Sequence, residues 1–245
     1  MTAPFPTRRQ EAWRYADLDA LQPVWEQLAE PLTLTVAAGG KLEQCWVPSE
    51  EDVQVRRVQL SVGRAATARI LVVNSALIYG RIEVQVSLAE DAQFELFATN
   101  IGKANSTNEI VTTVTHSGER SRSLQVVRSV LNGQATGSYI GRVEVARGAQ
   151  QSDAEQSVKS LLLERGASAN CKPELEIFAD DVRCAHGAAV GELDPLQLFY
   201  AQSRGLDPAG ARAILLEGFV MGLWDRADDP ETIANAARAA LRRVV

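Results

Sequence analysis

The chain has 245 residues, of which 46% are hydrophobic and 23% charged, a length and composition that suit a soluble globular protein with a sizeable core. Its net charge of -6 excludes a general nucleic-acid-binding protein, which needs a basic surface. No apolar run approaches the roughly 20 residues of a membrane helix, and the N-terminus lacks the apolar core of a signal peptide. We therefore expect a cytoplasmic protein without a membrane partner.

Residues 1–30 are expected to form a separate N-terminal segment. Within it, Trp13, Leu18 and Leu21 are spaced for one or two turns of amphipathic helix. We expect this segment to act as a lid that packs Trp13 and Tyr15 over the end of the main domain.

Residues 31–190 carry a β pattern, in which apolar side chains recur at every second position. About ten strands, spaced about 12–17 residues apart, exclude a doubly wound α/β fold, which needs helical patterns between its strands. A β-sandwich and a β-solenoid with an irregular repeat both remain open. The expected strands are 33–36, 53–55, 68–74, 82–88, 93–99, 110–116, 123–131, 138–146, 157–163 and 174–178.

Residues 191–245 are expected to be helical. Three Asp-Pro pairs each place an N-cap carboxylate before a proline at the first helical position: Asp194-Pro195, Asp207-Pro208 and Asp229-Pro230. Gly205 stands where the first helix should end. The second helix, expected from Ala209 to about Arg226, has an apolar arc too wide for a lone surface helix. Either this chain or a partner must cover that arc.

Two familiar catalytic or binding motifs are incomplete. Gly39-Gly40-Lys41 is followed by Leu42, where a phosphate-binding loop needs Ser or Thr, so nucleotide binding is not expected. His116 has no nucleophile-elbow context, and we expect it at the edge of a sheet or in a turn.

Cys184-Ala185-His186 is different, because residues i and i+2 of an extended segment project on the same side. A thiol and an imidazole make half of a tetrahedral site for iron or zinc. A complete site would need Cys171 or groups from another chain. The residues alone favour a buried thiol beside a hydrogen-bonded histidine. The three cysteines are odd in number, so reduced thiols are expected, and the sequence assigns no role to Cys45 or Cys171.

The C-terminal third of the chain contains an unusual set of motifs. They are Pro173-Glu-Leu-Glu-Ile, Asp180-Asp-Val-Arg-Cys-Ala-His-Gly-Ala, Val190-Gly, Leu198-Phe-Tyr and Ser203-Arg-Gly, together with Arg9-Gln-Glu-Ala-Trp-Arg-Tyr near the N-terminus. This combination resembles the SufD family of iron–sulfur cluster assembly scaffold proteins. Cys-Ala-His-Gly-Ala replaces the Glu-His-Glu-Ala that is typical of the paralogue SufB. The resemblance covers essentially the whole chain.

The resemblance implies a right-handed parallel β-helix (β-solenoid) core, mainly β, with a C-terminal helical subdomain that docks SufC. It implies a SufB–SufC–SufD complex in which SufC is the ATPase and this chain is not an enzyme. His186, with Cys184 beside it, would lie at the SufB interface and contact iron or a cluster transiently, without any stably bound cofactor. The residues expected on the docking helices are Phe199, Tyr200, Arg204 and Phe219.

Two alternatives stay open at this point. The first is a self-associating module in which Cys184 and His186 from two copies bind a metal, which would make a homodimer. The second is a β-solenoid enzyme acting on a polysaccharide, which the low aromatic content of 6% disfavours.

Overall fold

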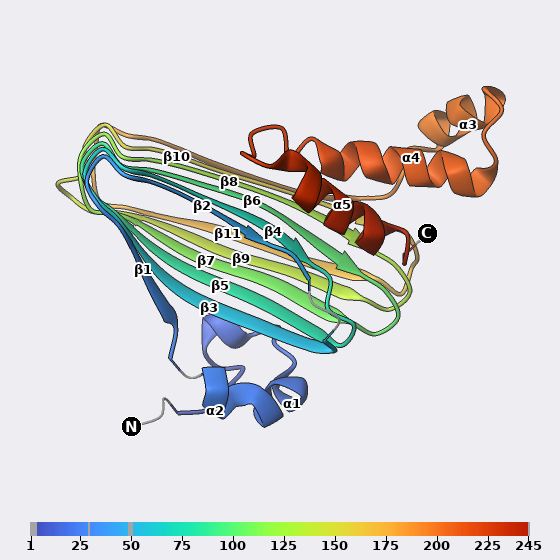
Figure 1. Ribbon diagram of the computed structural model, residues 1–245, viewed down its shortest axis with the longest axis horizontal. Coiled ribbons are helices and arrows are strands. Elements are labelled where there is room, and N and C mark those ends of the chain that lie inside the picture. Colours follow the sequence, from blue (N-terminus) through green and yellow to red (C-terminus); the bar gives the residue numbers. More distant parts are fainter. Residues whose placement is uncertain (1–3, 29, 49–50, 245) are drawn as a thin grey trace.

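The computed structural model describes residues 4–28, 30–48 and 51–244, and in it the chain forms a parallel β-solenoid flanked by helices (Figure 1). The strands are β1 (Leu32–Val36), β2 (Lys41–Trp46), β3 (Val53–Val62), β4 (Thr67–Asn74), β5 (Tyr79–Leu88), β6 (Gln93–Gly102), β7 (Thr107–His116), β8 (Arg122–Leu131), β9 (Thr136–Val145), β10 (Asp153–Leu162), β11 (Ser168–Ile177) and β12 (Arg183–Gly191). The helical elements are η1 (Glu11–Trp13), α1 (Leu18–Leu21), η2 (Gln22–Val24), α2 (Trp25–Leu28), α3 (Pro195–Ser203), α4 (Pro208–Met221) and α5 (Pro230–Leu241).

Successive strands alternate between two sheets. The odd sheet runs in the order β1-β3-β5-β7-β9-β11 and the even sheet in the order β12-β10-β8-β6-β4-β2. All strand pairs in the described residues are parallel, which selects the solenoid over the sandwich. The repeat is irregular: Val53 pairs with Tyr79, 26 positions on, whereas Thr136 pairs with Ser168, 32 positions on.

The core lies between the two sheets and follows the expected alternation. In β5, Val84, Val86 and Leu88 are buried in this core, whereas Gln85 and Ser87 are exposed. The short strand β2 was not among the expected strands. It follows the turn that contains Gly39, whose φ is 69°.

The run Ile70-Leu71-Val72-Val73 breaks the alternation because both faces of β4 are covered. Ile70 and Val72 point into the core between the sheets. Leu71 and Val73 instead pack on the outside with residues of the C-terminal helices. A strand that is buried on both faces reads as a continuous apolar run.

The wide apolar arc of the second C-terminal helix is largely covered by this chain. In the cluster on the outer face of the even sheet, Leu216 and Val220 of α4 pack with Ile233 and Leu241 of α5, which lies across the even strands in Figure 1. The helix ends at Met221, earlier than expected, with Gly222 at its C-cap.

The three Asp-Pro helix starts are confirmed. The side chains of Asp194, Asp207 and Asp229 accept hydrogen bonds from the backbone N–H groups of the first helical turns. Gly205 follows α3 with a φ of 96°, a left-handed conformation that glycine adopts without strain.

The N-terminal segment does not lie over the end of the solenoid, so the expectation that it forms a lid there is wrong. It packs on the outer face of the odd sheet, where Trp13, Leu21 and Trp25 contact Tyr79. The segment is held by the fully buried Arg81, whose guanidinium lies 3.6 Å from the centre of the Trp13 ring. The same side chain donates to the Ala12 carbonyl at 2.8 Å.

Two buried carboxylates also contact Arg81, and we call Arg81 with these carboxylates the Arg81 anchor. Arg81 lies 3.0 Å from Glu83 and 3.1 Å from Glu109, and the Tyr79 hydroxyl donates to Glu109 at 2.7 Å. Arg81 is thus held by carboxylates of the solenoid on one side and contacts Ala12 and Trp13 of the N-terminal segment on the other.

The expectation of an edge or turn position for His116 is wrong. It ends β7, which lies between β5 and β9 in the middle of the odd sheet, and it is fully buried. Its ring nitrogens each lie 2.8 Å from a hydroxyl, those of Ser121 and Ser123. Burial lowers the pKa of His116 to about 4, so the ring is neutral in the folded chain.

We predict that stability falls in acid because of His116. The unfolded chain binds a proton at a pKa of about 6.5, and the folded chain only near pH 4. The free energy of unfolding should therefore be highest above pH 6.5 and fall by about 3 kcal/mol as the pH drops to 4. Urea unfolding of the parent and of His116→Gln between pH 7.5 and 4 measures this contribution. An equal pH dependence in both proteins would contradict it.

We predict that Arg81→Ala lowers the free energy of unfolding by about 3–5 kcal/mol, because it leaves the buried Glu109 carboxylate without its cation, whereas Glu83 keeps Arg57. Arg142→Ala is the matched control. It removes an outward-facing arginine of the same sheet that is 45% exposed beside Glu144, and it should cost about 1 kcal/mol or less. Urea unfolding at pH 7 gives both values, and equal losses would show that the Arg81 anchor carries no special weight.

Candidate functional site at the open end of the solenoid

The last rung of the solenoid, formed by β11 and β12, has one open side. β11 pairs only with β9, and β12 only with β10. Both strands therefore present a row of unpaired backbone N–H and C=O groups, the arrangement that templates pairing with another strand. Pro173 lies in β11, and proline is tolerated in a sheet mainly on such an edge strand.

The side chains that face inward in this rung are also uncovered. Register with β10 places Cys184 beside Ala154 and His186 beside Gln156, both of which are buried. Cys184 and His186 therefore share the inward face of β12, as the i, i+2 spacing predicts. Most of their neighbours on this face are apolar, and Ile177 and Val190 are 40% and 49% exposed. The open end is thus an apolar surface with a thiol and an imidazole set into it.

The two predicted ligands differ in their surroundings. Cys184 is half-buried and packs near Ala154 and Ala179. Burial raises the pKa of the Cys184 thiol above its usual value, and a backbone hydrogen bond from Ala154 opposes that rise. The thiol is therefore protonated at neutral pH, and iron would have to displace its proton to bind sulfur.

His186 is exposed, and among the described residues it makes no side-chain hydrogen bond. The interpretation that the residues alone favour, a hydrogen-bonded histidine beside a buried thiol, is therefore wrong for His186, and the Cys184 thiol is half-buried. His186 is exposed because β12 belongs to the open rung, and none of the described strands covers the inward face of β12.

Cys171 does not complete a metal site with Cys184 and His186. Its sulfur lies 3.6 Å from the hydroxyl of Ser160, which is in register with Val190. Cys171 is thus opposite the Val190 end of β12, about 13 Å along the strand from His186. Nowhere in the described part of the chain do three His, Cys, Asp or Glu side chains gather as metal ligands. Cys45 lies on β2, at the other end of the even sheet.

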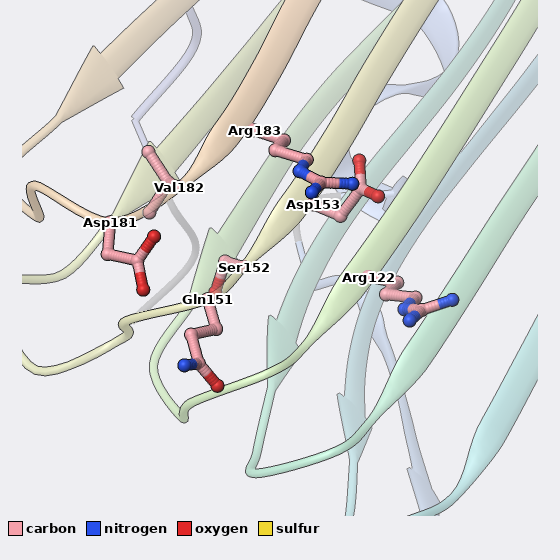
Figure 2. A pocket seen from close by; sticks show the side chains of 7 residues that line it. All are labelled: Arg122, Gln151, Ser152, Asp153, Asp181, Val182 and Arg183. Carbon is pink, nitrogen blue, oxygen red and sulfur yellow. The ribbon is translucent and has the colours of Figure 1, made fainter.

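A hollow of about 330 Å³ adjoins the open rung at the bend of the solenoid. Figure 2 shows its charged lining, in which Asp153 of β10 lies between Arg122 of β8 and Arg183 of β12. The three side chains stand in register on neighbouring strands, an alternation of charge that avoids like-charge contact. Sequence reasoning missed them because they are some 30 positions apart, and only the strand register brings them together.

The helix α3 carries a second exposed surface. Leu196, Phe199 and Tyr200 are 76%, 70% and 61% exposed, and their i, i+3, i+4 spacing puts them on one side of the helix. Arg204 follows at the end of the helix, with its guanidinium 5.1 Å from the centre of the Tyr200 ring. In Figure 1, α3 stands away from the solenoid.

Phe219 lies in a different setting from the other predicted docking residues. It is half-buried in the cluster between the helices and the even sheet, with the Arg128 guanidinium 5.8 Å from its ring centre. A further hollow of about 510 Å³ lies between α4 and α5, lined by Ala209, Ala213 and Leu241 among others.

Within the described ranges, no helix is both long enough and apolar enough to span a membrane.

Comparison with known proteins agrees with the fold and with the motifs. A family model described as "SUF system FeS cluster assembly, SufBD core domain" matches residues 28–219. An iron–sulfur cluster assembly SufBD family protein of Synechocystis is 28% identical over 73% of this chain and 40% of its own length. The SufD protein of Escherichia coli is 33% identical over 50% of this chain and 30% of its own length.

A chloroplastic protein of Arabidopsis thaliana, named ABCI7, is 50% identical over 36% of this chain and 18% of its own length. The matched region thus spans less than half of each of these relatives. The resemblance read from the sequence motifs is confirmed. The chain belongs to the SufBD family of the SUF iron–sulfur cluster assembly system and is a homologue of SufD.

Proposed function

We propose that this chain is a SufD-like scaffold subunit that joins a SufB-like paralogue through its open end and binds a SufC-like ATPase through α3. It has no catalytic activity of its own in this proposal. Iron or a nascent cluster is a substrate that visits the interface with the SufB-like subunit and is not a resident cofactor.

The observation that carries the proposal is the position of His186 and Cys184. They lie on the inward face of the terminal strand β12, where both the side chains and the strand edge are uncovered. A second solenoid stacked on this rung would pair with the edge and cover the apolar face. The thiol and the imidazole would then become part of a site shared between two chains.

This arrangement also explains why the ligand set is incomplete in one chain. A shared site needs only one or two groups from each partner, and iron takes both sulfur and nitrogen ligands. Because the Cys184 thiol is protonated in the isolated chain, the site would acquire metal only when iron displaces that proton.

The ATPase is assigned to α3 because its exposed stripe has no intramolecular role. Leu196 and Phe199 contact none of the buried clusters in the described residues, unlike the apolar side chains of α4 and α5. Large exposed aromatic residues on one helix side are typical of interface anchors.

A second candidate, a homodimer, is supported by the same open edge, because a strand edge can pair with its own copy. The outcome of co-expression with the SufB-like and SufC-like proteins separates the two candidates. The cytoplasmic location stays a prediction.

We predict that Val190→Asp lowers affinity for the SufB-like subunit about 30-fold, because the charge would be buried against the apolar face in the complex. Leu32→Asp is the matched control, since Leu32 is 58% exposed on β1 at the opposite end of the solenoid. Co-purification followed by titration measures both affinities. Equal effects of the two substitutions would contradict docking at the open end, and loss of self-association alone would favour the homodimer.

We predict that the double variant Leu196→Asp/Phe199→Asp abolishes binding of the SufC-like ATPase and any change in its ATP turnover. Pairing with the SufB-like subunit should persist, because α3 lies outside the open rung. Leu77→Asp, in the turn after β4 and 45% exposed, is the control for an added surface charge. Unchanged ATPase binding by the double variant would exclude α3 as the docking helix.

We predict that His186→Ala and Cys184→Ala still assemble with both partners but reduce cluster formation, with the larger loss for His186→Ala. The readout is cluster assembly in cells that carry each variant. Normal assembly in both would leave the residues with a packing role only.

A further inference from the structure

One row of inward-facing side chains changes from apolar to polar toward the open end. Beyond Gln44 of β2, the row crosses the even sheet in register from β4 to β12 and consists of Ile70, Leu96, Gln125, Gln156 and His186. The first two side chains are part of the apolar core. The next two are fully buried amides, and the last is the exposed imidazole of the open rung. Polar side chains in a solenoid core need partners, so the change calls for a physical reason.

The two amides are held by one phenol. The Tyr139 hydroxyl donates to Gln125 Oε1 at 3.1 Å, and Gln156 Nε2 donates to the same hydroxyl at 2.9 Å. The hydroxyl of Thr112 lies 3.3 Å away. The ring has room because residue 141 is glycine: a Cβ there would lie 2.1 Å from the Tyr139 oxygen. Burial raises the pKa of Tyr139 to about 12, so the phenol keeps the proton that it donates.

This network fixes the orientation of the Gln156 amide and leaves its oxygen without a partner. Gln156 is 1% exposed, and its Oε1 is buried and accepts no hydrogen bond from the described residues. On the side away from β8, the neighbour in register is His186 of β12. Neighbouring strands are about 4.8 Å apart, so amide and imidazole side chains in register are within reach of each other.

We propose that Gln156 is a positioning residue for His186. When a second solenoid covers the open end, one imidazole N–H of His186 donates to Gln156 Oε1. The bond selects one tautomer and directs the other ring nitrogen, with its lone pair, away from the bond toward the shared site. Hydrogen bonds of this kind orient histidine ligands and set their tautomer. The inference rests on the proposed function for the nature of the covering chain.

The test uses the two histidines of the chain, His116 and His186, as separate reporters. Long-range ¹H–¹⁵N correlation spectra of histidine-labelled chain, assembled with the SufB-like subunit or with itself, report the tautomer of each ring. We expect one tautomer of His186 to exceed the other at least about tenfold in the parent. Gln156→Met should give a mixture, and Gln156→Glu, which keeps an acceptor, should restore the single tautomer.

The signals of His116, held between Ser121 and Ser123, report whether each variant keeps its core. An unchanged His186 tautomer in a folded Gln156→Met assembly would overturn the positioning role. That result would leave the proposed function intact. A chain that assembles neither with the SufB-like subunit nor with itself would overturn both proposals.

Cluster assembly gives the second readout. If Gln156 acts through His186, the double variant Gln156→Met/His186→Ala should assemble clusters no worse than His186→Ala alone. A further loss in the double variant would contradict action through the imidazole. A defect in Gln156→Met without any defect in His186→Ala would contradict it as well.

Discussion

The pairing of each interior strand with the rung before and the rung after it is the constraint on which this structure depends. Parallel in-register pairing satisfies the backbone and aligns inward-facing side chains into continuous rows. It cannot satisfy the terminal rungs: β11 and β12, like β1 and β2 of the first rung, have neighbours on one side only. The same pairing that stabilises the interior of the solenoid therefore leaves its ends with unpaired strand edges.

The turns show how strongly the stacking of rungs governs local conformation. Four residues other than glycine adopt positive φ in the turns from odd to even strands: Ala65, Asp91, Arg120 and Gln151. In each case the backbone N–H donates to a carbonyl of the following rung. The hydrogen bond repeated from rung to rung offsets a backbone conformation that such residues rarely adopt.

The alternation between inward-facing and outward-facing positions also determines which residues form the candidate site. Outward-facing residues are covered where helices pack, as at Leu71 and Val73, and carry charge where they do not, as at Asp153 and Arg183. In the row that leads to His186, the inward-facing residues are apolar in β4 and β6 and polar from β8 onward. The polar row that leads to His186 is therefore part of the interior, although the histidine itself is exposed.

Much of the fold could be predicted from local patterns. The alternation in Ile82–Leu88 and the three Asp-Pro helix starts depend on neighbours in sequence, and the structure confirms them. The choice between sandwich and solenoid could not be made in this way, because the repeat varies between rungs. It came from the motifs around Cys184 and His186, through their resemblance to SufD.

The features that the sequence did not predict correctly depend on contacts between distant segments. The burial of His116 follows from the rungs stacked on either side of β7, and the docking of the N-terminal segment follows from the contacts of Arg81 with Ala12 and Trp13. Gln156 and His186 are likewise brought side by side only by the register of β10 and β12. Spacing along the sequence carries no information on these pairs.

The most direct test of the central claim is amide hydrogen exchange of the chain with and without the SufB-like subunit. Strand addition at the open end predicts new protection in Arg183–Gly191 of β12, while Lys41–Trp46 of β2 at the other end of the sheet is unchanged. Protection that appears at β2, or a complex that leaves β12 as accessible as in the free chain, would contradict the account.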